Sequence, residues 1–325
     1  MQWLVNSWYQ RRWFRFLLWP ISVLYGVIVA CRRTLFRLGI FKSESMNVPV
    51  IVVGNLTVGG TGKTPLVAAI AHDLINIGRR PGIVSRGYKG HAKTWPQFVT
   101  ADSDPLQVGD ESVVLAQQCR CPVAAAPKRV HAARYLIDQK QCDVIISDDG
   151  LQHYGLQRDI EIVVIDGERR LGNWMLLPAG PLRELVSRLA KVDMIVVNGE
   201  ACNDEYAMTL QSMGVVNFFD ATQTLSPQRI HAVAAIGNPQ RFFQSLRWLG
   251  YEVIEHAFPD HYFFKSDDLR FAEKCPIVMT SKDAIKCQSF AHSECWIANV
   301  SAQLDEAFFQ QLHSCLHCVS KVILL

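Results

Sequence analysis

A glycine-rich segment near residue 60 combines the residue types that bind phosphate. After the apolar run PVIVV the chain reads GNLTVGGTGKTP from Gly54 to Pro65, and a helical pattern follows. A strand, a glycine-rich turn and a Lys-Thr pair that opens a helix are the context of a P-loop, whose backbone N–H groups close around phosphate oxygens. We therefore expect Lys63 to reach the β- and γ-phosphates of a nucleotide and the Thr64 hydroxyl to coordinate Mg²⁺. The predicted phosphate-binding residues are Thr57, Val58, Gly59, Gly60, Thr61, Gly62, Lys63 and Thr64.

The loop departs from the strict pattern GxxxxGK[ST], because Thr57 stands where the first glycine belongs. Its sequence GGTGKT is close to the deviant loop of partition-type ATPases, KGGxGKT, although that class has a signature lysine where this chain has Val58. A glycine-rich turn without function is the alternative. The combination of strand, turn and helix argues against that alternative.

Two adjacent carboxylates end another apolar run. The sequence DVIISDDG places Asp148 and Asp149 after a β-branched segment, which is the Walker B arrangement for Mg²⁺. Many strands end in Asp because Asp favours turns. The pair therefore indicates a metal site only in combination with the glycine-rich loop. We predict that at least one of the two carboxylates contacts the metal, and the sequence does not choose between them.

The first 43 residues differ from the rest of the 325-residue chain in charge and in aromatic content. They carry seven arginine and lysine side chains, no acidic side chain, and four of the eight tryptophans. Residues 16–31 form an uncharged apolar run, short of the roughly 20 residues needed to span a bilayer as a helix. This pattern favours a helix at the lipid headgroup level. A true span and a helix packed on the body are the alternatives.

The remainder of the chain is typical of a cytosolic body without a general nucleic-acid surface. The whole chain has a net charge of +3, and the first 43 residues contribute more than this, so the body is mildly acidic. The ten cysteines are scattered and are expected to be reduced thiols. No nucleic-acid partner and no obligate protein partner are predicted.

From residue 49 onward, short β-branched runs alternate with helical stretches, which predicts a P-loop NTPase-like α/β fold with a doubly wound, mostly parallel sheet. The strands read as continuous apolar runs, as in strands covered on both faces, at 49–53, 82–85, 143–147, 160–165 and 193–197. The helices are expected at 64–78, 110–118, 128–139 and 182–190. A second set predicts a smaller α/β domain, with strands at 231–236, 251–256, 276–280 and 295–298 and helices at 239–249, 267–274, 283–290 and 303–316. The predicted domains are a membrane-associated helix at 1–43, a P-loop domain at 44–222 and the smaller domain at 223–325.

Several short motifs together resemble the tetraacyldisaccharide 4′-kinase (lipid A 4′-kinase) family. Members of that family show a loop like TVGGTGKTP, followed by SRGY, GDE, DDGxQH, LLPAGPLRE, FPDHY and TxKDA. In this chain the same order is found at 57–65, 85–88, 109–111, 148–153, 176–184, 258–262 and 280–284. The match extends from residue 51 to about residue 286, and the order of the motifs makes it specific, since each motif alone is weak.

Four positions depart from the family pattern. Leu151 replaces an aromatic residue in DDGFQH, Ser112 and Leu185 replace the prolines that follow GDE and LRE, and Ser281 replaces the glutamate of TEKDA. Ser281 removes any carboxylate role at its position. None of the four removes a residue assigned to catalysis.

The resemblance implies transfer of the γ-phosphoryl group of ATP to the 4′-hydroxyl of a tetraacylated glucosamine disaccharide 1-phosphate, in lipid A biosynthesis. It implies two α/β domains joined by a short β linker, with the active site in the cleft. The catalytic residues would be Lys63, Asp110 and His261, of which Asp110 and His261 act as a pair. ATP and Mg²⁺ would be the cofactors. The enzyme would work on an anionic membrane surface, at the cytoplasmic face of the bacterial inner membrane.

Four further residues are candidates for substrate binding, namely Arg86, Glu111, Gln152 and Arg183. Arginine suits bidentate recognition of phosphate, so Arg183 is expected to meet the lipid 1-phosphate or the phosphates of ATP. An ion pair with a carboxylate is the alternative for Arg183. Gln152 is expected either to line the site beside Asp149 or to hold the loop through hydrogen bonds.

Two other functions fit parts of the sequence. A partition-type regulatory P-loop ATPase at the membrane is the first, and Val58 in place of the signature lysine counts against it, as does the N-terminal position of the apolar segment. A membrane scaffold with a decayed loop is the second. Intact Lys63, Thr64 and Asp148 count against the scaffold.

Overall fold

The larger half of the molecule is a mostly parallel sheet with helices on both faces. The structure, a computed structural model, describes residues 8–9, 15–260 and 262–323. The strands of this half are β1 (Val50–Gly54), β2 (Pro81–Ser85), β3 (Gln97–Val99), β4 (Val123–Ala125), β5 (Val144–Asp148), β6 (Ile160–Asp166) and β7 (Met194–Asn198). The helices are α3 (Lys63–Asn76), α4 (Pro105–Val108), α5 (Asp110–Gln118), α6 (Arg129–Lys140) and the 3₁₀ segment η1 (Val186–Lys191). Helices α3 and α5 share one buried cluster with the sheet, whereas α6 packs on the opposite face.

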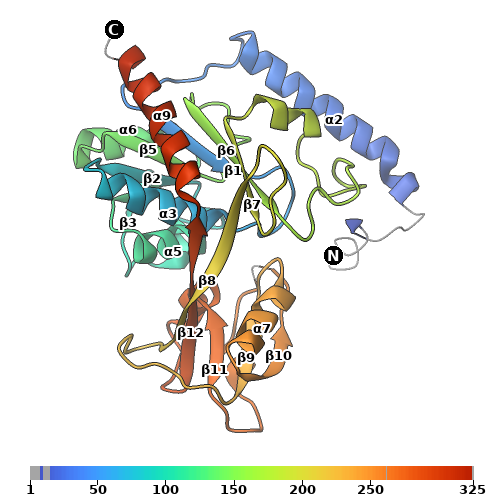
Figure 1. The fold of residues 1–325 in the computed structure, drawn as a ribbon, viewed down its shortest axis with the longest axis vertical. Coiled ribbons are helices and arrows are strands. Elements are labelled where there is room, and N and C mark those ends of the chain that lie inside the picture. The colour runs from blue at the N-terminus through green and yellow to red at the C-terminus, as the bar shows by residue number, and fades with distance from the viewer. Residues whose placement is uncertain (1–7, 10–14, 261, 324–325) are drawn as a thin grey trace.

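Two long strands lead from the larger half into the smaller half (Figure 1). These are β8 (Tyr206–Asn217) and β12 (Cys295–Leu304), which pair antiparallel with a register shift between Ala298 and Val300. The smaller half contains β9 (Arg229–Ala234), α7 (Pro239–Trp248), β10 (Glu252–Ala257), η2 (Ser266–Leu269), β11 (Ile277–Thr280) and α8 (Ser281–Cys287). One twelve-stranded sheet results, in the order β10-β9-β11-β12-β8-β7-β6-β1-β5-β2-β4-β3.

Helix α9 (Glu306–Ile323) follows β12 and returns to the larger half, where it runs beside α3 in Figure 1. Phe308, Leu312 and Leu316 are buried in the same cluster as Leu66 and Ile70 of α3. The last described residues therefore pack with the P-loop half, although they follow the smaller half in the sequence.

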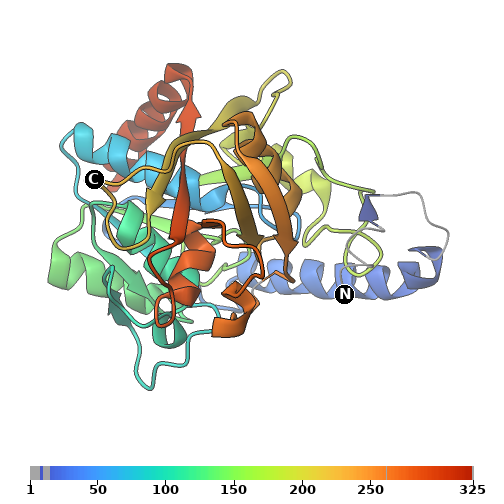
Figure 2. The same cartoon turned by 90° about the horizontal axis from the view of Figure 1, so that it is seen from below.

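Helix α2 (Arg15–Arg37) lies along the outside of the larger half and extends beyond it (Figure 2). The stretch Phe16–Arg37 is long and apolar enough to cross a membrane by length and composition alone. One face of α2 is bonded to the body. The hydroxyl of Ser22 donates to Leu176 O at 2.8 Å and accepts from Ala179 N at 2.9 Å, and the Tyr25 hydroxyl donates to Arg183 O at 3.1 Å.

The expected α/β fold is confirmed, and the structure differs from three local expectations. The helix expected at 267–274 is only the 3₁₀ segment η2, which ends at Leu269. The segment expected to be helical at 182–190 is extended up to Leu185, because the backbone of Leu182 and Arg183 bonds to the segment around Leu56 and Thr57. Strand β8 is not among the strands that the sequence predicts, although its side chains alternate between more buried and more exposed over much of its length. The domain division at 222/223 stays a prediction.

Candidate active site

The glycine-rich loop lies between β1 and α3, at the carboxyl end of a fully buried strand. Gly59 and Gly62 have φ angles of 115° and 97°, which L-residues with a side chain rarely adopt. A Cβ at Gly62 would also lie 2.8 Å from Asn198 Nδ2. The backbone conformation therefore requires glycine at residue 62, directly before α3, and a Cβ there would also displace the Asn198 amide.

An extended segment borders this loop and explains how the LLPAGPLRE motif reaches the site. Val58 N donates to Pro181 O at 2.9 Å, and Arg183 N donates to Leu56 O at 2.7 Å. Thr57 and Leu182 form an isolated antiparallel bridge. These backbone bonds place Arg183 beside the turn that follows β5.

Asp149 contacts cations from two other motifs, the glycine-rich loop and LLPAGPLRE. Lys63 Nζ lies 3.4 Å from Asp149 Oδ1, and Arg183 Nη1 lies 3.2 Å from both carboxylate oxygens. Burial opposes ionisation, but the charges of Lys63, Arg183 and Arg129 outweigh it and hold the pKa of Asp149 below its usual range. We call Lys63, Asp149 and Arg183 the phosphate-side cluster.

Asp148 has a different environment from its neighbour. It is 3% exposed, and its Oδ1 atom has no hydrogen-bond partner among the described residues. Burial, together with the charges of Glu111 and Asp149, raises the pKa of Asp148. A buried carboxylate oxygen without a partner is costly, and a bound cation is one way to satisfy it.

Asp110 and Glu111 open helix α5 and meet two lysines of helix α8. Glu111 Oε1 lies 2.8 Å from Lys282 Nζ. Lys286 Nζ lies 3.9 Å from Asp110 Oδ2 and 2.9 Å from the fully buried Asp283. We call Asp110, Glu111, Lys282 and Lys286 the acceptor-side cluster.

The carboxylates of α5 act on the charge of Lys282 across the two halves. Burial lowers the pKa of Lys282, but Glu111 and Asp110 outweigh it and keep this pKa above its ordinary value. Asp283 also accepts from Ala235 N at 3.0 Å and from Thr280 Oγ1 at 2.8 Å. Lys286 is therefore held at Asp110 by a carboxylate that is itself fixed in the core of the smaller half.

His261 lies outside the described residues. Its neighbour Asp260 contributes to the raised pKa of Lys282. On the larger half, Lys89 Nζ lies 5.2 Å from the centre of the Phe263 ring. The segments that contain the SRGY and FPDHY motifs therefore approach one another across the two halves.

The other predicted substrate residues have distinct surroundings. Arg86 is exposed, and its charge lowers the pKa of His153, after burial and the charges of Arg129, Arg158 and Arg32. Gln152 Nε2 donates to Asn55 O and to Glu184 Oε1, both at 3.1 Å. Gln152 thus holds the DDGLQH loop through hydrogen bonds.

Two features of the site were missed from the sequence. The buried Arg129 donates from Nη2 to the backbone oxygens of Asp148 and Asp149 at 3.0 and 2.9 Å, and burial lowers its pKa to about 10. No role had been assigned to Lys282 and Lys286 either. Their i, i+4 spacing on one helix face, within and after the TxKDA motif, was the available signal.

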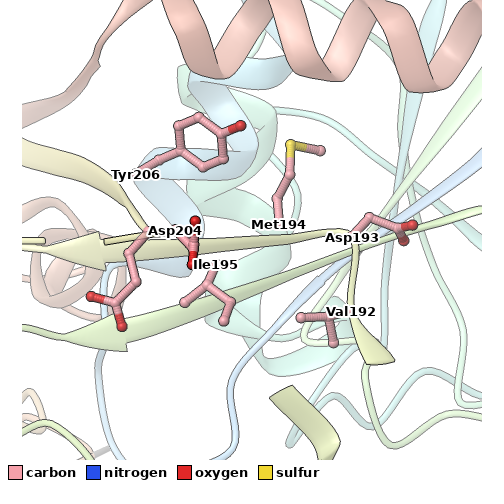
Figure 3. A pocket seen from close by; sticks show the side chains of 7 residues that line it. Val192, Asp193, Met194, Ile195, Asp204 and Tyr206 are labelled. Atoms are coloured by element: carbon pink, nitrogen blue, oxygen red, sulfur yellow. The ribbon is translucent and has the colours of Figure 1, made fainter. Parts of the chain in front are cut away.

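A cavity of about 340 Å³ elsewhere in the larger half is not part of this site (Figure 3). It is lined by Val192, Asp193, Met194, Ile195, Asp204, Glu205 and Tyr206, at the opposite end of β7 from Asn198. Two of its three carboxylates, Asp193 and Glu205, already stabilise the fold. Asp193 accepts from Glu161 N at 2.7 Å, and Glu205 binds the Arg170 guanidinium.

The fold and the site define the class of protein. A glycine-rich loop between a buried strand and a helix, with a carboxylate pair at the end of the adjacent parallel strand, is the construction of P-loop NTPases. The residues that surround it include both cations and carboxylates, as phosphoryl transfer requires.

Comparisons with known proteins identify the family within this class. A family model described as tetraacyldisaccharide-1-P 4′-kinase matches residues 14–317. A tetraacyldisaccharide 4′-kinase of Nitrosococcus oceani is 46% identical over 322 residues, which are 98% of this chain and 95% of that protein. One from Alkalilimnicola ehrlichii is 48% identical over 313 residues, 94% of this chain and 93% of the relative.

A solved structure agrees with these matches. The crystal structure of LpxK from Aquifex aeolicus in complex with ATP superposes with a TM-score of 0.77 at 27% identity, over 94% of this chain and all of that chain. This chain belongs to the tetraacyldisaccharide-1-P 4′-kinase family. Membership of this family favours a kinase over the alternative of a partition-type regulatory ATPase.

Proposed function

We propose that this chain transfers the γ-phosphoryl group of ATP to the 4′-hydroxyl of a tetraacylated glucosamine disaccharide 1-phosphate, between the phosphate-side and the acceptor-side clusters. One observation carries the assignment of the site. Glu111 of the larger half pairs with Lys282 of the smaller half at 2.8 Å, and the charge of Glu111 also raises the pKa of Asp148, which adjoins the phosphate-side cluster. Residues from both halves thus share one electrostatic environment beside the glycine-rich loop.

Lys63 is the proposed cation that stabilises the negative charge of the phosphoryl group as it is transferred. Phosphoryl transfer passes through a loose transition state, so catalysis consists mainly of positioning and charge stabilisation. Asp149 holds Lys63 and Arg183 within 3.4 Å of its carboxylate. Two cations that are ordered by a shared carboxylate lose less side-chain freedom when they bind phosphates, which lowers the entropic cost of binding.

The residues around Asp148 fit a magnesium ion. The unpartnered Oδ1 of Asp148 supports this site, and the Thr64 hydroxyl at the start of α3 would supply a second oxygen. Among the described residues there is no cage of three or more Asp, Glu, His or Cys side chains. This sparse oxygen set suits Mg²⁺, which keeps several waters and takes phosphate oxygens. When bound, the ion would neutralise charge on the β- and γ-phosphates.

Asp110 is the proposed acceptor of the proton from the sugar hydroxyl. Its Oδ1 accepts from Glu111 N at 2.9 Å, and its Oδ2 faces Lys286. A sugar hydroxyl is a weak acid, so the carboxylate takes the proton late, as the bond to phosphorus forms. The family motif assigns His261 as the partner that orients Asp110 or shares this proton.

Helix α2 is proposed to lie on the cytoplasmic face of the inner membrane rather than to cross it. Its exposed apolar side chains are Phe16, Leu17, Trp19, Ile21, Val23, Leu24, Val27 and Ile28. The opposite face is bonded to the body between Ser22 and Arg32, and Arg32 donates to Gln152 O at 3.3 Å. A helix bound to the body along one face matches an interfacial helix better than a span.

The reaction is tested with the full-length protein in mixed micelles that contain the tetraacylated disaccharide 1-phosphate, ATP and Mg²⁺. The expected result is phosphorylation of the 4′-position, with ATP hydrolysis far slower when the acceptor is omitted. Acceptor-independent hydrolysis without a phosphorylated lipid would show instead a regulatory ATPase.

A further inference from the structure

The turn between β9 and α7, in the smaller half, rests directly on the glycine-rich loop. A Cβ added to Gly237 would lie 2.7 Å from Gly60 N. Arg169 of the larger half donates from Nη1 to Gly237 O at 2.9 Å. The two halves thus touch at the loop itself, and this contact continues into helix α7.

Asn198, at the carboxyl end of β7, links α7 to the loop. It is 3% exposed, and both ends of its amide are bonded. Its Nδ2 donates to Thr61 O at 3.1 Å, and its Oδ1 accepts from Arg241 Nη2 at 2.7 Å. A carbonyl only accepts and a guanidinium only donates, so these partners fix the orientation of the amide.

The bond to Thr61 determines where a phosphate-binding amide points. The Thr61–Gly62 peptide is planar and trans, so its C=O and N–H point in opposite directions. When Asn198 holds Thr61 O, the Gly62 N–H is turned to the other side of the peptide. Gly62 precedes α3 directly, and N–H groups at that position bind phosphate oxygens.

We propose that Arg241 is a positioning residue that, through Asn198, sets the Thr61–Gly62 peptide for binding the phosphates of ATP. This inference rests on the proposed role of the glycine-rich loop. Because Arg241 belongs to α7, the peptide is set only while the smaller half is docked on the loop. The docked halves are therefore a condition for tight nucleotide binding, in addition to assembling the acceptor-side cluster.

The test compares Arg241→Gln and Arg241→Lys with a matched control, Arg247→Gln. Arg247 lies on the same helix, is exposed, and pairs with Glu255 of β10. Loss of one charge-assisted hydrogen bond corresponds to roughly tenfold. We expect Arg241→Gln to raise the KM for ATP by about that factor and to leave the KM for the lipid acceptor unchanged. Arg241→Lys, which keeps a charged donor and most of the reach of arginine, should recover part of the loss, and Arg247→Gln should match the wild type.

A second variant separates positioning from folding. Asn198→Asp keeps an acceptor for Arg241 but places a carboxylate oxygen against Thr61 O, so the bond that orients the peptide is lost. We expect Asn198→Asp to have a melting temperature close to that of the wild type. Its KM for ATP should rise by about the same factor as the KM of Arg241→Gln. A KM for ATP in both Arg241→Gln and Asn198→Asp equal to that of Arg247→Gln would overturn the proposal. Lys63→Ala, measured in parallel, separates the role of the glycine-rich loop from the positioning role of Arg241. If Lys63→Ala stays active, the assignment of the loop is wrong. If Lys63→Ala is inactive and Arg241→Gln is normal, only the positioning role is refuted.

Discussion

The phosphate-side and acceptor-side clusters are both sets of lysines or arginines around carboxylates, but they are built differently. Lys63, Asp149 and Arg183 all come from the larger half. In the acceptor-side cluster the carboxylates belong to α5 and the lysines to α8, on opposite halves. The first cluster is present however the halves are arranged, whereas the second exists only when α8 is docked on α5. We infer that the phosphate-side cluster is preformed within the larger half, whereas the acceptor-side cluster is assembled from both halves.

The largest expected loss comes from the acceptor-side cluster. Asp110→Ala should lower kcat by about 10²–10⁴-fold, because it removes the group that takes the proton of the sugar hydroxyl. His261→Ala should have an effect of the same order if the two act as a pair. The double variant should then lose little more than the worse single variant, as measured by steady-state phosphorylation of the lipid. Losses that multiply would mean that the two residues act independently.

Lys63→Ala breaks the phosphate-side cluster. Removal of a preorganised charge at the reacting group costs about 10²–10³-fold in kcat. The melting temperature should change little, since Asp149 keeps its contact with Arg183. Lys191→Ala, an exposed lysine of the same half, is the control and should match the wild type. Near-normal turnover of Lys63→Ala would remove the P-loop from the mechanism.

Helix α2 contacts the segments that carry the phosphate-side cluster, because Tyr25 donates to Arg183 O and Arg32 donates to Gln152 O. Leu24 and Ile28 are 61% and 59% exposed, and burying one such side chain contributes about 1.5–3 kcal/mol. Leu24→Glu and Ile28→Glu should therefore each weaken binding to anionic vesicles by roughly tenfold or more in a flotation assay. Ile77→Glu, at an exposed apolar residue on the body, should not. Equal vesicle binding by all three variants would place the membrane contact elsewhere.

Point variants test α2 better than deletion of residues 1–43. From the sequence alone such a deletion is expected to release the protein from the membrane and to spare nucleotide binding. The structure changes this expectation, because Tyr25 donates to Arg183 O and Arg32 to Gln152 O. Loss of the helix would disturb the segment that carries Arg183, so an effect on ATP would not reveal the role of the membrane.

The sequence predicts the parts of the site that lie within one short segment. The glycine-rich loop and the Asp148–Asp149 pair each follow a buried strand directly, and parallel strands bring their carboxyl ends to one edge. It did not predict that Arg183 would meet Asp149, because this contact depends on backbone bonds between residues 56–58 and 181–183. Nor did it predict that Lys282 would meet Glu111. That contact depends on the docking of two halves, which no local pattern encodes.

The most direct test of a site assembled from two halves is a double-mutant cycle on Glu111 and Lys282. Their side chains lie 2.8 Å apart across the interface, and neighbouring charged residues show coupling energies of about 0.5–3 kcal/mol. Glu111→Ala, Lys282→Ala and the double variant are compared by kcat/KM for the lipid acceptor. We predict that the double variant loses no more activity than the worse single variant, because each change already breaks the same contact. Losses that add fully in free energy would contradict an active site built jointly by α5 and α8.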